Sequence, residues 1–136
     1  MRTLILAALA ALALTTVPAA AGPCDQMRTQ EQSNACAESD YKAATAEINR
    51  LYNDTLAKYD AKNQTLLRTA ERAWITFRDA ECAFRNAGNA GASTWPMVHF
   101  SCLAELTRKR IDELKAAHDC QAGDLTCNQN ADSGAD

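Results

Sequence analysis

Residues 63–86 read NQTLLRTAERAWITFRDAECAFRN and predict a long helix in the middle of the 136-residue chain. Their apolar side chains recur at intervals of three and four residues, which is the period of an α-helix. We expect these residues on the inner face, with Phe77 at its centre: Leu66, Leu67, Ala70, Ala73, Trp74, Phe77, Ala80 and Phe84. The segment therefore predicts an amphipathic helix that packs against partners through this face.

Two further helices are predicted on either side of this segment. The first begins at the capping-box pattern Thr-Gln-Glu-Gln of residues 29–32, whose side chains can satisfy free backbone amides, and runs to about Lys62. The third begins near residues 93–94 and runs to about His118. Pro96 then lies in its first turn, where a missing amide hydrogen costs nothing.

The composition limits the fold to one helical domain. The chain has only five glycines and three prolines, and 23% of its residues are charged, which excludes collagen-like, proline-rich and strongly charged disordered classes. Short connections make successive helices antiparallel. We therefore predict an all-α fold, an antiparallel up-down-up three-helix bundle over about residues 29–118, stabilised by disulfides.

The first residues have the pattern of a secretory signal peptide. A positively charged start precedes an uncharged run over residues 4–17, and small residues end at Ala21, where we predict cleavage. The run is too short to span a membrane. Pro23, directly before Cys24, is not the small residue that a lipid anchor on that cysteine requires. We expect residues 1–21 to be removed, leaving a periplasmic or secreted protein without a membrane anchor.

Six cysteines in so short a chain indicate an oxidising compartment and structural disulfides. Spacing alone permits fifteen pairings. The antiparallel layout selects one set. It places Cys82 opposite Cys102 on neighbouring helices, Cys24 on the segment that folds back over the helix start at Cys36, and Cys120 near Cys127 at the opposite end. Residues 22–120 then form the helical domain, and residues 121–136 form a mostly disordered tail with a local disulfide.

The sequence offers no pattern for catalysis or for a cofactor. His99 and His118 are the only histidines and stand far apart, and the cysteines show no C-x-x-C spacing. Removal of residues 1–21 would take away Arg2 and leave 13 Lys and Arg against 17 Asp and Glu, a net charge of −4. We expect no enzyme activity, no metal, no cofactor and no nucleic-acid partner.

The outer face of the central helix carries candidate partner-binding residues. At 100° per residue, Arg68, Arg72, Ile75 and Asp79 lie on the side opposite Phe77, where core packing does not require them. They form either a protein-binding patch with one apolar anchor or a solvated face whose charges pair with neighbouring helices. Trp95 is either an exposed anchor before Pro96 or a lid over the helix ends. The candidates for partner binding are Arg72, Ile75, Asp79 and Trp95.

One string in the central helix carries a family resemblance. Residues 71–82, ERAWITFRDAEC, followed by Cys-Leu at 102–103 and Leu-Thr-Arg at 106–108, resemble the N-terminal domain of the LprI lysozyme inhibitor family, formerly a domain of unknown function. Asn-Ala-Cys at 34–36 and Ile-Asn-Arg-Leu-Tyr at 48–52 fit the same pattern. The similarity runs from about residue 24 to residue 114.

The resemblance implies a small, helical, disulfide-stabilised protein outside the cytoplasm, with lysozyme inhibition as the activity attached to the family name. We expect a monomeric binding protein whose partner is a lysozyme and which covers the sugar-binding cleft of that enzyme. The alternative is an envelope accessory protein of the periplasm that binds another component and has no effect on lysozyme.

Overall fold

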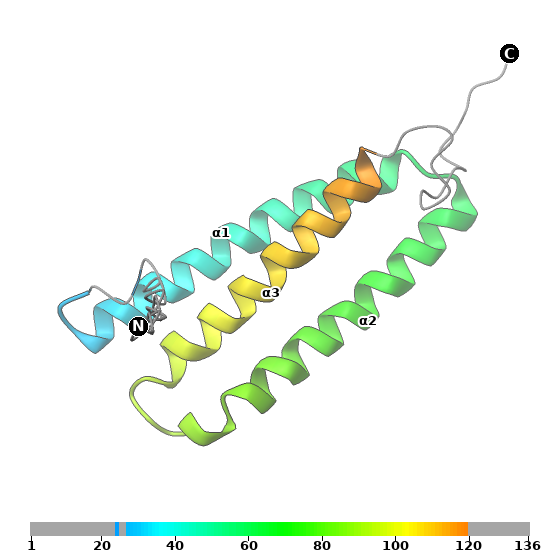
Figure 1. Ribbon diagram of the computed structural model, residues 1–136. Helices are drawn as coiled ribbons and strands as arrows, with labels where there is room; N and C mark the ends of the chain where they lie inside the picture. The colour runs from blue at the N-terminus through cyan, green and yellow to red at the C-terminus, as the bar shows by residue number, and fades with distance from the viewer. Residues whose placement is uncertain (1–23, 25–26, 120–136) are drawn as a thin grey trace, which may run out of the picture.

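The protein is all-helical in the computed structural model, which describes residue 24 and residues 27–119 (Figure 1). These described residues form three α-helices and a short 3-10 helix, and they contain no strand. The elements are α1 (Gln30–Ala57), α2 (Ala61–Arg85), η1 (Ala87–Asn89) and α3 (Trp95–His118). The predicted fold class is therefore confirmed at the level of its helices.

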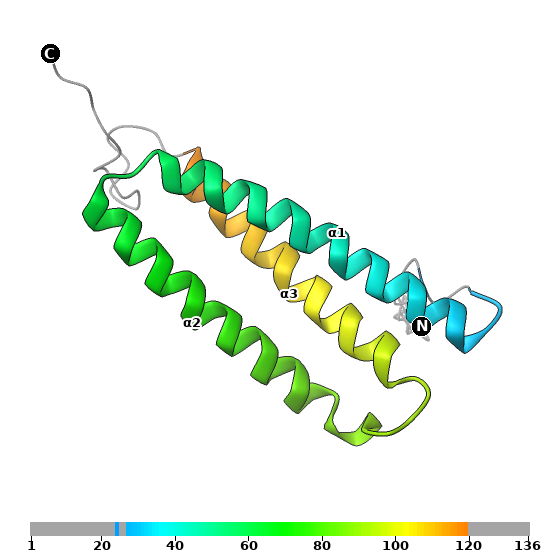
Figure 2. The same cartoon turned by 180° about the vertical axis from the view of Figure 1, so that it is seen from behind.

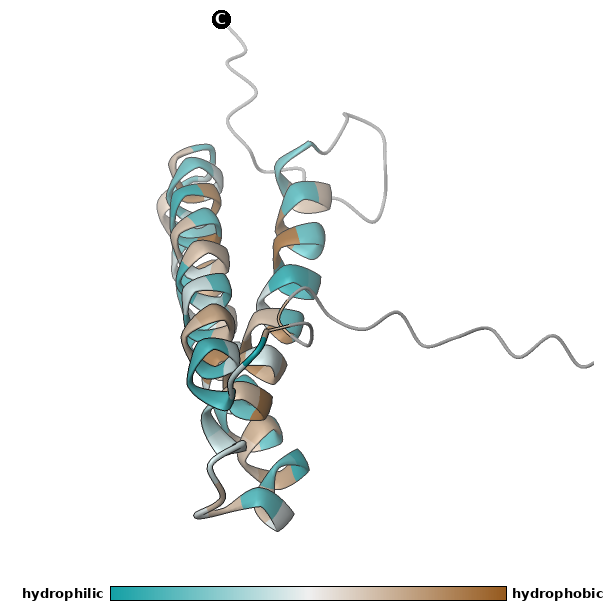
Figure 3. Cartoon of the chain, turned by 90° about the vertical axis from the view of Figure 1, so that its left-hand side faces the viewer, coloured by the Kyte–Doolittle hydropathy of each residue, from teal (hydrophilic) through white to brown (hydrophobic). Residues whose placement is uncertain are grey.

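Three predictions lie outside the described residues: the signal peptide at residues 1–21, the tail at residues 121–136, and the pairing of Cys120 with Cys127. They stay predictions. No helix among the residues described is long and apolar enough to cross a membrane. In Figure 3, polar and apolar segments alternate along the helices, as amphipathic helices require.

Side-chain caps set the start of α1 and of α2. Thr29 caps α1 as predicted, because its hydroxyl accepts a hydrogen bond of 3.2 Å from the amide of Gln32. Asp60 caps α2 by accepting a bond of 2.8 Å from the amide of Asn63. This second cap makes α1 end at Ala57, earlier than the predicted end at Lys62.

α1 and α3 form the closest pair of helices. Figures 1 and 2, which view the molecule from opposite sides, show α1 and α3 lying side by side along most of their length. Ion pairs link Asp40 to Arg108 and, at 3.0 Å, Glu47 to Lys115. Four buried residues form the main core between the two helices: Ile48, Leu51, Ile111 and Leu114.

Both predicted disulfides within the described residues are present. Cys24 bonds to Cys36 near the start of α1, and Cys82 near the end of α2 bonds to Cys102 in α3. The second disulfide belongs to a buried cluster that also contains Leu103 and Leu106. It fixes the end of α2 against the first half of α3.

α2 packs less closely on the rest of the molecule than α1 and α3 pack on each other. It is joined to α3 by the Cys82–Cys102 disulfide and by an ion pair of 3.1 Å between Glu71 and Arg110. The antiparallel up-down-up arrangement of the three helices stays a prediction.

The predicted inner face of α2 is wrong at its centre, whereas two of its members, Leu67 and Trp74, are partly buried and pack against the core as predicted. Phe77 is 55% exposed, Phe84 79% and Leu66 56%, whereas Glu71 and Arg78 are buried. The buried face is centred near Arg78, about 100° around the helix from Phe77. The Cys82–Cys102 disulfide explains this rotation, because Cys82 lies about 140° from Phe77 and has to face α3.

Candidate functional site

A buried arginine organises the contact of α2 with the other helices. The guanidinium carbon of Arg78 lies 5.5 Å from the ring centre of Tyr41 and 5.1 Å from that of Trp74. Asp79 accepts hydrogen bonds of 2.9 and 2.7 Å from Arg78 on one carboxylate oxygen. The cation is therefore stacked on aromatic rings of α1 and α2 and neutralised by its neighbour.

A second arginine also lies close to Trp74. Arg110 of α3 places its guanidinium carbon 6.0 Å from that ring, and it donates hydrogen bonds to Glu71 at 3.1 Å and Glu113 at 2.8 Å. Burial acts to lower the pKa of Arg110, but the bonds to Glu113 and Glu71 outweigh it and raise the pKa above its ordinary value. Arg110 thus stays charged and anchors Glu71.

A groove of about 290 Å³ lies between α1 and α2, beside this cluster. Glu71 connects the two, because it lines the groove and also pairs with Arg110. The groove residues combine an aromatic ring, an amide, an aliphatic side chain and charged groups: Asn49, Tyr52, Arg68, Glu71, Arg72 and Ile75. We call this feature the α1–α2 groove.

The exposed side of the α1–α2 groove is cationic. Arg68 and Arg72 lie one helical turn apart and are both exposed. Arg68 donates to Gln64 at 3.1 Å, and Arg72 donates to Thr69 at 3.4 Å. Among the described residues, neither guanidinium forms an ion pair with a carboxylate. Both charges are therefore available to an anionic group of a partner.

The structure brings two of the four predicted partner-binding residues together. Arg72 and Ile75 line the α1–α2 groove, and Ile75 is 40% exposed. Asp79 follows Ile75 by one helical turn, is exposed, and holds Arg78 in place. Asp79 therefore pairs within its own helix and, among the described residues, does not pair with a neighbouring helix.

The fourth candidate, Trp95, lies apart from the groove residues. It is the first residue of α3, and its ring stacks on His99 with centroids 4.4 Å apart. The start of α3 packs near the start of α1, where Asn34 donates a hydrogen bond of 3.0 Å to the carbonyl of Ser93. Trp95 is half-buried there and does not line the groove.

The histidines and acidic residues show no arrangement for metal binding in the part of the chain that the structure describes. His99 packs between Trp95 and Phe100 near the start of α3. His118 is the last residue of α3, and its Nδ1 atom lies 3.4 Å from the hydroxyl of Thr55. The two rings are therefore at opposite ends of one helix.

The sequence analysis missed four contributors to this region: Asn49, Tyr52, Glu71 and Arg78. The burial of two of them could have been predicted from the disulfide between Cys82 and Cys102. Residues four and eleven positions before Cys82 share its side of the helix, and these are Arg78 and Glu71. Asn49 and Tyr52 had no such signal, because their role depends on how far α2 lies from α1.

Comparisons with known proteins identify a family for this chain. The family model described as lysozyme inhibitor LprI matches residues 24–114. An uncharacterized protein of Rhizobium meliloti (strain 1021) is 38% identical in sequence, over 79% of this chain and 90% of the relative. No solved structure matches. The family match spans α1, α2, most of α3 and both disulfides described above, and the chain therefore belongs to the LprI lysozyme inhibitor family.

Proposed function

We propose that this protein inhibits a lysozyme by covering its sugar-binding cleft with the exposed ridge of α2. Family membership supports the activity. The observation that carries the choice of surface is the pair of exposed guanidiniums, Arg68 and Arg72, beside Ile75 on the α1–α2 groove. From Arg68 to Asp79 this ridge is about 16 Å long, at 1.5 Å per residue.

The charges of the ridge suit the cleft of a glycosidase. Such enzymes place two carboxyl groups on either side of the bond that they cleave. A guanidinium can bind a carboxylate through two parallel hydrogen bonds, and Arg68 and Arg72 have no carboxylate partner of their own among the described residues. Ile75 then supplies an apolar contact between the polar ones.

The overall charge favours the same partner over longer distances. The chain without residues 1–21 has a net charge of −4, whereas lysozymes of the animal type are cationic. This attraction raises the association rate and weakens as salt screens it. Inhibition should therefore be stronger at low ionic strength than at high ionic strength.

The proposal includes export and the absence of catalysis. Disulfides between Cys24 and Cys36 and between Cys82 and Cys102 are typical of proteins outside the cytoplasm. With the predicted signal peptide, they support a periplasmic or secreted binding protein. The predicted up-down-up bundle would serve as a rigid support for the ridge, without a catalytic residue.

A turbidity assay of lysozyme on bacterial cell walls tests the proposal. We expect the purified protein at micromolar concentration to slow clearing of the suspension at low salt, and to slow it less at high salt. Full clearing at low salt, with folded protein in excess over lysozyme, would exclude inhibition. The protein would then be an envelope accessory protein that binds another periplasmic component.

A variant series locates the binding surface. Arg68→Ala, Arg72→Ala and Ile75→Ala should each weaken inhibition by about fivefold or more, because they remove groups at the centre of the proposed contact. Arg50→Ala is the matched control, since Arg50 is an exposed arginine of α1 that does not line the groove. Asp79→Ala and Trp95→Ala complete the series. Inhibition that is unaltered in the three groove variants would place the contact elsewhere.

A further inference from the structure

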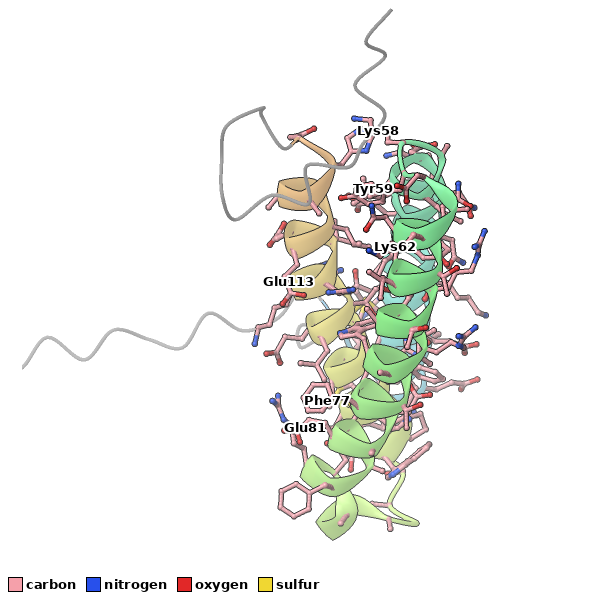
Figure 4. All side chains as sticks on the ribbon, turned by 90° about the vertical axis from the view of Figure 1, so that its right-hand side faces the viewer. Lys58, Tyr59, Lys62, Phe77, Glu81 and Glu113 are labelled. Atoms are coloured by element: carbon pink, nitrogen blue, oxygen red, sulfur yellow. A yellow bond between two sulfur atoms is a disulfide. The ribbon has the colours of Figure 1, made fainter. Side chains whose placement is uncertain are left out.

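α2 carries a second exposed surface that the proposed function does not use. It consists of apolar residues spaced four, three, four, three and four positions apart, all of them exposed: Leu66, Ala70, Ala73, Phe77, Ala80 and Phe84. We call this surface the α2 apolar stripe. Its length is about 27 Å. Figure 4 shows Phe77 on the edge of α2 that borders α3 and away from α1.

The spacing of the α2 apolar stripe is that of a coiled coil. Alternating steps of three and four residues are the a and d positions of a heptad repeat, and they continue over the whole stripe without a break. Such a row packs best against another helix with the same repeat. The described part of this chain offers no such helix, because α1 and α3 contact α2 on the face of Arg78.

The order of large and small residues selects the partner. The stripe is symmetric about position 75, so in an antiparallel pair of identical helices each Phe77 lies opposite Ala73 of the other copy. In the same pairing Leu66 lies opposite Phe84, and Ala70 lies opposite Ala80. Each ring thus meets a smaller aliphatic side chain, Ala73 or Leu66, and the pair of Ala70 with Ala80 lies between these contacts, so ring does not meet ring. A parallel pair would instead place each phenylalanine ring opposite the same ring of the other copy.

The flanks of the stripe also suit an identical copy. In an antiparallel pair, the residues that flank the stripe on one side face the same residues of the other copy. The flank on one side consists of uncharged residues: Thr69, Thr76 and Ala83. The hydroxyls of Thr69 and Thr76 donate to backbone carbonyls of their own helix, at 2.9 and 3.0 Å. The other flank holds Glu81, which pairs with Arg85 at 2.7 Å. No unpaired like charges would meet.

We infer that the protein forms a symmetric dimer through the α2 apolar stripe, with the two α2 helices antiparallel and a two-fold axis beside position 75. A second copy fits better than the tail, because residues 120–136 contain only one large aliphatic side chain, Leu125. This inference does not rest on lysozyme binding. Ile75 lies about 160° around the helix from Phe77, so both α1–α2 grooves of the dimer would face outward.

Light scattering after gel filtration, run over a range of concentrations, measures the mass of the purified protein. We expect the mass of two chains at tens of micromolar and a decline toward one chain on dilution. Phe77→Glu should raise the dissociation constant of the dimer by about tenfold or more, since it places a charge in the apolar contact. Phe84→Glu, at a position 79% exposed in one chain, should do the same without loss of helical circular dichroism.

Ile75→Glu is the matched control, because Ile75 is an exposed apolar residue on the opposite side of the same helix. It should leave the dissociation constant unchanged. The mass of one chain at every concentration would overturn the inference. Equal effects of Ile75→Glu and Phe77→Glu would also overturn it, as would a dimer that forms only after deletion of residues 120–136, since the tail would then be what covers the stripe.

Cysteine cross-linking tests the antiparallel register. Air oxidation of a mixture of A73C and F77C chains should link the two variants to each other faster than either variant links to itself. Peptide mapping identifies the linked pair. Faster linking of A73C to A73C would indicate parallel helices and contradict the proposed symmetry.

Discussion

Arg78 shows how one residue can determine the position of a helix. Its side chain is 10% exposed and lies over Tyr41 and Trp74, while Asp79, with 57% of its side chain exposed, neutralises it. A buried cation costs free energy unless a negative charge neutralises it, and the carboxylate of Asp79 supplies that charge. Arg78 therefore fixes the rotation of α2 as well as its contact with α1.

Replacement of Arg78 tests this role. Arg78→Ala should lower the free energy of unfolding by about 2 kcal/mol, because it removes both ring contacts and the pairing with Asp79. Arg78→Lys should recover less than half of the loss, since an ammonium group is not planar and cannot stack. Urea unfolding followed by circular dichroism measures both. Arg50→Ala, at an exposed site, should change the value by less than about 0.5 kcal/mol. An equal loss in Arg50→Ala and Arg78→Ala would contradict the assignment.

Glu105 provides a prediction about pH. A hydrogen bond of 2.6 Å from Lys109 lowers the pKa of Glu105 below its ordinary value, against the smaller opposing effect of partial burial. The pKa of Glu105 is lower in the folded state than in the unfolded state. The ionised carboxylate therefore contributes its full stabilisation of the fold at pH values above the unfolded-state pKa. This stabilisation is lost as the pH falls through the folded value.

Carboxyl NMR titration measures this shift directly. Lys109→Ala should move the titration midpoint of Glu105 upward, toward that of a free glutamate, because it removes the strongest interaction with the carboxylate. Lys42→Ala, which removes the partner of Glu38, should leave the midpoint of Glu105 unchanged. A midpoint that does not move in the Lys109 variant would show that the hydrogen bond is absent in solution.

At the scale of elements, α2 depends on a few specific contacts. α1 and α3 share the core around Ile48 and Leu114, whereas α2 is linked mainly through the Cys82–Cys102 disulfide, the Glu71–Arg110 ion pair and the Arg78 stack. A helix with few buried apolar contacts opens more readily than its neighbours. We therefore expect α2 to be the least stable of the three helices.

Removal of the Cys82–Cys102 disulfide tests this order. Replacing both cysteines by serine should destabilise the protein by about 3 kcal/mol, the value expected for a cross-link that closes a loop of this length. Amide hydrogen exchange should become faster throughout α2 before it becomes faster in α1 and α3. The control replaces Cys24 and Cys36, and it should leave the exchange of α2 unchanged. Uniform acceleration in all three helices would contradict the proposed independence of α2.

At the scale of the whole molecule, α2 presents two surfaces on opposite sides. One is the charged ridge beside the α1–α2 groove, and the other is the α2 apolar stripe. The first suits a partner with carboxylates, and the second suits a copy of the same chain. One helix could thus support dimer formation and partner binding together, without competition between them.

The proposed binding mode needs no proton carrier, and the histidines test this point. The double variant His99→Ala and His118→Ala should inhibit lysozyme within about twofold of the unchanged protein, because neither ring lines the α1–α2 groove. Turbidity assays at equal concentrations of folded protein make the comparison. A large loss of inhibition with helical content preserved would show that one of the ends of α3 takes part in binding.

The sequence by itself determined the helices, the cap at Thr29, two of the disulfides and the family. The helices and the cap depend on local patterns, since helical period and capping residues act over a few residues. The disulfides follow from the order of the helices along the chain, because they join cysteines 12 and 20 residues apart. The oligomeric state does not follow from such local patterns, and the monomer expected from the sequence stays a prediction.

Only the tertiary structure decided which face of α2 is buried. The helix has apolar residues at Phe77 and Phe84 and polar ones at Glu71 and Arg78, so hydrophobic period alone favours the wrong face. Arg108 likewise pairs across helices, with Asp40 of α1. The hydrophobic period of the sequence shows that a helix has a row of apolar residues. Contacts with other helices decide whether that row packs within the same chain, packs against another chain or is exposed to water.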